Sequence, residues 1–210
     1  MRRISFLPAV IALFLTANIF AQNQTTRNLS AFDKISISGG FEKVVLSAGS
    51  SESVGIEAPG VDPEDVITEI KGSTLNIRMK KGSYNKDHKI RLTVTYRNLS
   101  ELSNSGSTDI ETTAAIKGDS FEFNSSGSGD FTGAFDVKDL KINISGSSDM
   151  KLSGKADKQA IAISGSGDVN AKALSGSEAS VAISGSGDVA LHVNGPVRTA
   201  VSGSGAVNNH

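Results

Sequence analysis

The sequence contains no cysteine and no tryptophan, and it has only two tyrosines, four prolines and three histidines among 210 residues. The absence of cysteine excludes a disulfide framework, a thiolate metal site and a cysteine nucleophile, so stability must come from packing and backbone hydrogen bonds. Neither sign of charge predominates, since 21 lysines and arginines accompany 22 aspartates and glutamates. This balance disfavours a strongly basic nucleic-acid-binding domain, and we expect no nucleic-acid partner.

Glycine is abundant, with 22 residues, and the apolar fraction is 38%. Such an apolar fraction is sufficient for a hydrophobic core and disfavours wholesale disorder. The length fits one compact body, or one body with a small appendage. The composition therefore indicates a turn-rich globular chain rather than a multidomain enzyme.

Residues 1–21 have the pattern of a cleaved secretory signal peptide, in which two arginines precede an apolar stretch that ends at Ala21. An uncleaved membrane anchor is the alternative, but the stretch is short for a span of about 20 residues and contains a proline and an asparagine. No cysteine follows Ala21, which excludes a bacterial lipoprotein anchor. We predict export to the periplasm, the outer surface or the medium, with no transmembrane segment after signal cleavage.

Six copies of the tripeptide Ser-Gly-Ser follow one another at intervals of 18 to 21 residues. An aspartate follows three residues after each of the first five glycines, and the next position is always apolar. Glycine tolerates positive φ and aspartate accepts backbone hydrogen bonds, so each copy predicts a tight turn. The predicted structural turn residues are Gly106, Gly127, Gly146, Gly165, Gly185 and Gly203, and the aspartates are Asp109, Asp130, Asp149, Asp168 and Asp188, with Ala206 in the last copy.

Apolar residues alternate with polar or small ones on both sides of each turn, which predicts two short half-buried strands per copy. A unit of this size cannot bury its apolar face alone, whereas stacked copies can. We therefore predict an all-β parallel solenoid with coils of about 20 residues, and an up-and-down meander is the alternative. Four phenylalanines fall at inward positions of the repeat and are expected in the core: Phe121, Phe123, Phe131 and Phe135.

Residues 22–100 lack the strict repeat and are expected to form an irregular N-terminal β part of the solenoid, while residues 101–210 form the regular part. The stretch 35–40 resembles a degenerate first copy of the turn motif. Residues 63–70 follow Asp62 and are expected to form one short helix or 3₁₀ turn, because aspartate caps helices and proline suits the first helical position. The predicted strands of this part are 34–37, 43–46, 53–56, 74–78 and 91–96.

Four features together resemble one known family: the opening at 32–39, the segment 72–77, the junction 99–106 and the tail of Ser-Gly-Ser-Gly-Asp copies. The family is the "putative auto-transporter adhesin, head GIN domain" family, and the resemblance covers essentially the whole chain after the signal. It implies a right-handed β-helix-like fold distantly similar to pectin-lyase-type solenoids, in envelope or secreted proteins of Bacteroidetes-type bacteria. It also implies a role in adhesion, and it supplies no catalytic residues.

The five aspartates are expected to line one edge of the solenoid about 5 Å apart, the spacing between neighbouring strands. One interpretation is calcium binding, but calcium takes roughly six to eight oxygen ligands, and one carboxylate per coil supplies few of them. The other interpretation, which we favour, is that each aspartate closes its own turn. We therefore expect no cofactor, with calcium as the alternative.

The three histidines, His88, His192 and His210, lie far apart in the predicted topology, so a shared metal site or catalytic triad is not expected. Basic residues of the repeat region occupy no common position, and no aromatic residue follows Phe135. We therefore predict a non-enzymatic, exported envelope or surface protein with an adhesive or structural role. Its partner would be a protein or a cell surface, and the chain would also self-associate through its terminal coil. The alternative is a glycan-binding or polysaccharide-processing β-helix protein.

Overall fold

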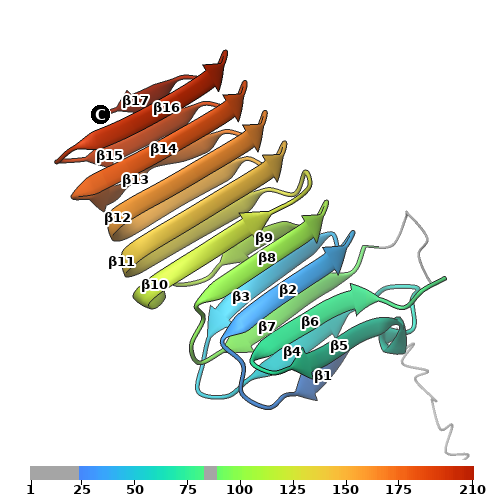
Figure 1. Cartoon of the computed structure of the whole chain (residues 1–210). Coiled ribbons are helices and arrows are strands. Elements are labelled where there is room, and N and C mark those ends of the chain that lie inside the picture. The colour runs from blue at the N-terminus through green and yellow to red at the C-terminus, as the bar shows by residue number, and fades with distance from the viewer. Residues whose placement is uncertain (1–23, 83–88) are drawn as a thin grey trace, which may run out of the picture.

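The computed structural model describes residues 24–82 and 89–210, and these residues form strands apart from loops and one 3₁₀ turn, η1 (Pro63–Asp65) (Figure 1). The predicted signal peptide and His88 lie outside the described residues. The strands are β1 (Gln24–Asn28), β2 (Lys34–Gly39), β3 (Lys43–Ala48), β4 (Ser53–Glu57), β5 (Val66–Lys71), β6 (Thr74–Met79), β7 (Arg91–Tyr96), β8 (Glu101–Gly106), β9 (Asp109–Thr112), β10 (Ile116–Ser125), β11 (Phe131–Gly146), β12 (Met150–Gly165), β13 (Val169–Gly176), β14 (Glu178–Gly185), β15 (Val189–Val193), β16 (Val197–Gly203) and β17 (Val207–Asn209).

The strands wind into a solenoid with two main parallel sheets. The first, called the serine sheet here, contains in order β6, β2, β8, β10, β11, β12, β14 and β16, where β10, β11 and β12 contribute their C-terminal parts. The second, the back sheet, contains β7, β3, β9, the N-terminal parts of β11 and β12, then β13, β15 and β17. The parallel pairing confirms the predicted solenoid and excludes the meander.

The register keeps each repeat above its equivalent in the next coil. In the serine sheet, for example, Gly146 pairs with Gly165, Gly165 with Gly185, and Gly185 with Gly203. The degenerate first copy obeys the same register, because Gly39 pairs with Gly106. The identical side chains seen along the sequence therefore form columns that run along the solenoid axis.

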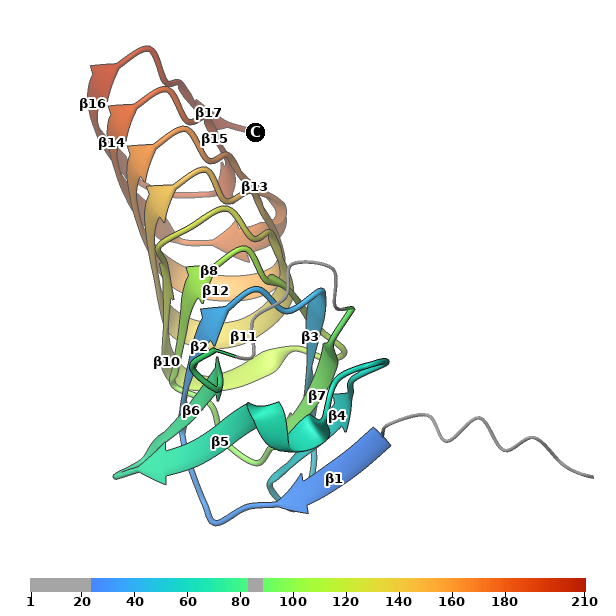
Figure 2. The same ribbon diagram turned by 90° about the vertical axis from the view of Figure 1, so that its right-hand side faces the viewer.

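The stacking order departs from the sequence order in the N-terminal part. Strand β8 lies directly beside β2, although some sixty residues separate them in the sequence, and β6 lies on the other side of β2. The intervening chain, together with β1, forms antiparallel pairs at the far end of the stack, β1 with β4, β4 with β7 and β5 with β6. Figure 2 shows β5, η1 and β1 lying across this end of the solenoid.

Strand formation in the N-terminal part largely follows the sequence pattern, since all five predicted strands are present as β2, β3, β4, β6 and β7. The predicted helical segment 63–70 is only partly correct. Its first three residues form η1, where the Asp62 carboxylate accepts a hydrogen bond from Glu64 N at 2.9 Å. The remainder is β5, because Val66, Ile67 and Ile70 are β-branched and pair with β6 through a hairpin at Gly72.

The core is one continuous apolar column inside the coils. Residues two and four positions before each turn glycine point inward, as Ile161 and Ile163 do in β12, each 2% exposed. The four predicted core phenylalanines are each 1% exposed. Their tilted rings pack against one another, with 4.6 Å between the Phe123 and Phe131 centroids. Their prediction as core residues is confirmed.

The turn glycines occupy corners where neighbouring coils touch through their backbones. A Cβ placed on Gly165 would overlap the carbonyl oxygen of Gly146, and the backbone of Gly165 has φ of +145°. The same overlap recurs at each step of the column, from Gly39 through Gly106, Gly127, Gly146, Gly165 and Gly185 to Gly203. A side chain at any of these positions after Gly39 would force two coils apart.

We predict that Gly165→Ala lowers the free energy of unfolding by about 3 kcal/mol, because it combines steric overlap with a backbone conformation that disfavours alanine. Gly118→Ala is the matched control, since its Cβ would meet no atom nearer than Ser120 O at 3.9 Å. Urea unfolding followed by circular dichroism measures both. Equal stability of the two variants would contradict the close contact at the corner.

Candidate functional site

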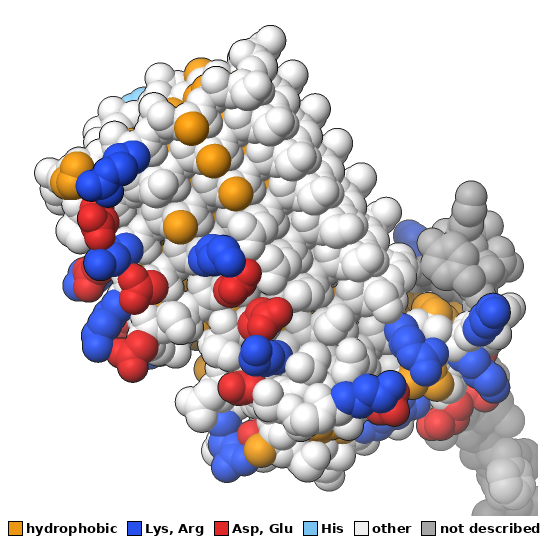
Figure 3. All heavy atoms as spheres, viewed as in Figure 1, with side chains coloured by type: hydrophobic (Ala, Val, Ile, Leu, Met, Phe, Trp, Pro, Cys, Tyr) orange, Lys and Arg blue, Asp and Glu red, His pale blue; other side chains and the backbone are white. Residues whose placement is uncertain are grey.

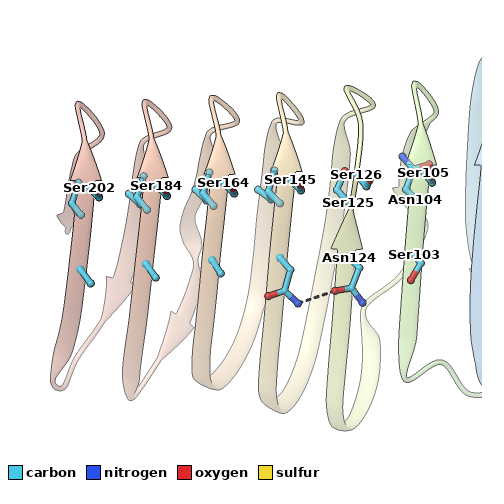
Figure 4. Close-up of a pocket in the computed structure, with 18 residues that line it drawn as sticks. Ser103, Asn104, Ser105, Asn124, Ser125, Ser126, Ser145, Ser164, Ser184 and Ser202 are labelled. Carbon is cyan, nitrogen blue, oxygen red and sulfur yellow. Dashed lines mark hydrogen bonds between the residues drawn. The ribbon is translucent and has the colours of Figure 1, made fainter.

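The outer surface of the serine sheet carries a shallow trough of about 870 Å³ that crosses six strands from β8 to β16. One column of it consists of the serine before each turn glycine, and every one of these serines is exposed. Figure 4 shows this column beside a second one, formed by the residues two positions earlier in each strand. The serines are Ser105, Ser126, Ser145, Ser164, Ser184 and Ser202, and the second column is Ser103, Asn124, Asn143, Ala162, Ala182 and Ala200. The residues between these columns complete the lining and are Asn104, Ser125, Ile144, Ile163, Ile183 and Val201. We call this surface the serine trough.

No lysine, arginine, aspartate or glutamate lines the trough. Its second column changes along the axis, from serine and asparagine in the first three coils to alanine in the last three. The two asparagines bond to each other, since Asn143 Nδ2 donates to Asn124 Oδ1 at 2.8 Å. The trough therefore offers a serine hydroxyl in every coil, beside amides at one end and methyl groups at the other.

Charged side chains gather along one edge of this face, while the rest of it is nearly free of them (Figure 3). At that edge the charges pair between adjacent coils, as Glu122 does with Lys141 at 3.0 Å and Lys158 with Glu178 at 3.3 Å. In the same way Lys34 binds Glu101, and this hydrogen bond raises the pKa of the lysine. The edge is therefore a row of exposed, locally neutral pairs rather than a basic cluster for an acidic substrate.

The structure brings the five predicted aspartates into a ladder at the coil corners, but their hydrogen bonds differ from the expectation. Each Oδ1 accepts from the backbone N–H at the equivalent position of the next coil, instead of from its own turn. For example, Asp168 N donates to Asp149 Oδ1 at 2.9 Å, and Asp188 N donates to Asp168 Oδ1 at 2.7 Å. Because the turns stack in register, the next N–H lies closest to the carboxylate, so the ladder links coils.

The ladder continues to the last copy, where Ala206 N donates to Asp188 Oδ1 at 2.8 Å. One oxygen of each carboxylate is thus already engaged by the protein. Within residues 24–82 and 89–210, no three histidine, aspartate or glutamate side chains are grouped so that they could hold a metal ion. His192 is exposed on β15 and His210 is exposed beyond β17.

The repeat motif alone does not predict the trough, because Ser-Gly-Ser-Gly-Asp is typical of a tight turn. The structure places the first serine of each copy at the end of a strand, facing outward, beside the residue two positions earlier. The available signal was the strict alternation before each glycine, which puts these two positions on the outer face of the sheet.

The geometry defines a class of protein, a β-solenoid with one flat, uncharged face. The chain belongs to the family described as "Putative auto-transporter adhesin, head GIN domain", whose model matches residues 31–210. No curated protein matches the chain. Among the described residues, no helix has the length and apolar character needed to cross a membrane.

Solved structures of bacterial proteins share the fold. A putative adhesin from Bacteroides fragilis NCTC 9343 is similar with a TM-score of 0.75 and 19% identity, over 89% of this chain and 96% of that one. A putative adhesin from Parabacteroides merdae ATCC 43184 gives a TM-score of 0.72 and 18% identity, over 89% and 95%. A putative lipid binding protein from Parabacteroides distasonis ATCC 8503 gives 0.62 and 21%, over 90% and 98%.

We predict that Asp168→Ala lowers the free energy of unfolding by about 1 kcal/mol, because Asp188 N loses its acceptor. Asp168→Asn keeps an oxygen in the same place and removes one charge from the ladder, so its stability should equal that of the unsubstituted chain. Thermal and urea unfolding of both variants tests this. A loss of the same size in both would show that the charge, and not the acceptor, is what the coil contact requires.

Proposed function

We propose that this chain is a non-enzymatic, adhesin-like protein that is exported and binds a protein or cell-surface partner through the serine trough. The observation that carries the proposal is the trough itself, an exposed surface without charges that repeats the same hydroxyl in six successive coils. Membership of the adhesin family supports a surface location. The names of two of the similar structures point the same way.

The dimensions of the trough suit an extended partner. Six strands at about 4.8 Å spacing span about 24 Å, enough to contact a length of polymer rather than one small molecule. Its walls are formed by the solenoid's own hydrogen-bonded strands, so binding needs no ordering of a loop, and the entropic cost of association is kept low. The binding free energies of weak contacts repeated in each coil then add up along the axis.

The absence of a catalytic role is also part of this proposal. The carboxylates of the ladder each engage a backbone N–H, and Lys138, Lys141, Lys155 and Lys158 each pair with an acid. A polysaccharide lyase or hydrolase needs a free acid or base beside its substrate. The trough presents serine hydroxyls, and no histidine is among the described residues that line it.

Glycan binding is the second candidate function. The row of serine hydroxyls, together with the Asn124 and Asn143 amides, could hydrogen-bond to a chain rich in hydroxyl groups. The trough has no aromatic side chain on which a sugar ring could stack. We therefore rank a glycan partner after a protein partner.

The adhesive role predicts that beads coated with the chain are retained on an immobilised surface, and that Ala182→Glu reduces their retention at least about tenfold. The substitution places an unpaired charge in the middle of the trough, where a bound partner would have to desolvate it. Thr132→Glu is the matched control, because Thr132 is exposed on the N-terminal part of β11 in the back sheet.

Three coatings separate the candidates: collagen for a protein partner, mucin for a glycosylated surface, and a purified neutral polysaccharide for a glycan alone. Retention on the polysaccharide alone would favour the second candidate. Equal retention of the two variants, or no retention of the unsubstituted chain on any coating, would contradict the trough as the adhesive surface.

We also propose that the aspartate ladder works without a bound cation, since its carboxylates already accept hydrogen bonds from the next coil. Calorimetric titration with calcium chloride should give no saturable heat, and the melting temperature should be the same with calcium and with a chelator. A saturable heat with a raised melting temperature would instead make the ladder a row of calcium ligands.

A further inference from the structure

The last coil leaves part of its apolar side uncovered. In β16, Val197, Thr199 and Val201 take the places that Ala179, Val181 and Ile183 occupy in β14. Ile183 is 3% exposed, whereas Val201 is 44% exposed and is the one large hydrophobic side chain that is exposed among the described residues. The inner face of β16 is therefore an apolar surface that none of the described residues covers.

The backbone of β16 is also available for pairing. It pairs with β14 on one side, and within the described residues no strand pairs with its other side. Proteins usually protect such an edge with a bulge, a proline within the strand or an inward-pointing charge. Strand β16 has none of these, since its register with β14 is unbroken and its one charged residue, Arg198, points outward.

The opposite end of the solenoid is closed. There β5 and β1 are antiparallel strands, and η1 lies across the same end with Val66 fully buried behind it (Figure 2). A head-to-tail contact would place the apolar inner face of β16 against that end, where no described large hydrophobic side chain is exposed. The surface that matches the β16 edge is the β16 edge of a second copy.

The charges of the last coil permit two copies to meet. Residues 194–210 contain one lysine, arginine, aspartate or glutamate, namely Arg198, and Ala206 replaces the aspartate of the ladder. Two such coils can therefore approach without burying a cluster of like charges.

We propose that the chain forms an isologous dimer in which β16 pairs antiparallel with β16 of a second copy, with Ala200 at the two-fold axis. This register pairs Thr199 with Val201 of the second copy on the inner face, and Arg198 with Ser202 of the second copy on the outer face. The axis is perpendicular to the serine sheet, so one continuous sheet runs through both copies. The two serine troughs then lie on the same side of the dimer.

This arrangement makes the dimer bivalent toward any extended surface. Two weak contacts held on one rigid sheet bind more tightly than either alone, because the second contact forms at a high effective concentration. That consequence rests on the proposed function, whereas the dimer itself does not. Oligomeric state is measured without any partner, so failure of the adhesion experiment and failure of the dimer are distinguishable.

Sedimentation velocity over a concentration series tests the dimer, using a chain that starts at residue 22 and keeps all the described strands. We expect a reversible dimer, and Val201→Lys should raise its Kd at least about 100-fold, because the substitution buries an unpaired charge. Thr132→Lys is the matched control, since it places the same charge on an exposed residue of the back sheet that does not take part in the proposed strand pair. A monomer at every concentration, or a series of larger species, would overturn the proposal.

The absence of cysteine allows a second, independent test. Ala200→Cys should form a cross-linked dimer under mild oxidation, because residues facing each other across an antiparallel pair have Cα atoms about 4.5 to 5.5 Å apart, within the range for a disulfide. Ala162→Cys is the control, since it occupies the same column of the trough on β12, between two paired strands. Cross-linking of the control alone, or dimers that survive Val201→Lys, would place the contact elsewhere and overturn the proposal.

Discussion

The structure depends on the contact between the backbones of successive coils at the turn glycines. A column of glycines without Cβ atoms allows each corner to lie directly on the one before, at the spacing of hydrogen-bonded strands. That contact keeps the register of both sheets, aligns the apolar residues into one core and brings each aspartate within reach of the next coil's N–H. The columns of the serine trough follow from the same alignment.

Much of the fold follows from the sequence because the repeat is strict. Six glycines at intervals of 18 to 21 residues fix the coil length, and the alternation around Ile161 and Ile163 fixes which side is inside. The N-terminal part is less predictable. The degenerate copy at 35–40 supplies the glycine that pairs with Gly106, but the sequence does not show that β2 lies directly beside β8 across the strands between them. Strand β5 was not predicted, because Asp62 and Pro63 also fit the start of a helix.

The candidate site was harder to predict from the sequence than the fold, for a related reason. The sequence identified the aspartates as a column, but the identity of the hydrogen-bond donor depends on the spacing of stacked turns, and no single turn contains that information. The serine trough was missed because Ser-Gly-Ser is a common turn sequence. Only the three-dimensional register reveals that its first serine belongs to a sheet and that six of them align.

The excursion that lets β8 dock on β2 has an evolutionary consequence. It completes the closed end of the solenoid before the regular coils begin, so the coils from β10 to β14 form their strand pairs with the coils on either side of them. Duplication or deletion of one repeat in the gene would therefore lengthen or shorten the molecule by one step while the closed end stays intact. The number of repeats in such a gene therefore determines the length of the solenoid, and selection can change that length without altering the other coils.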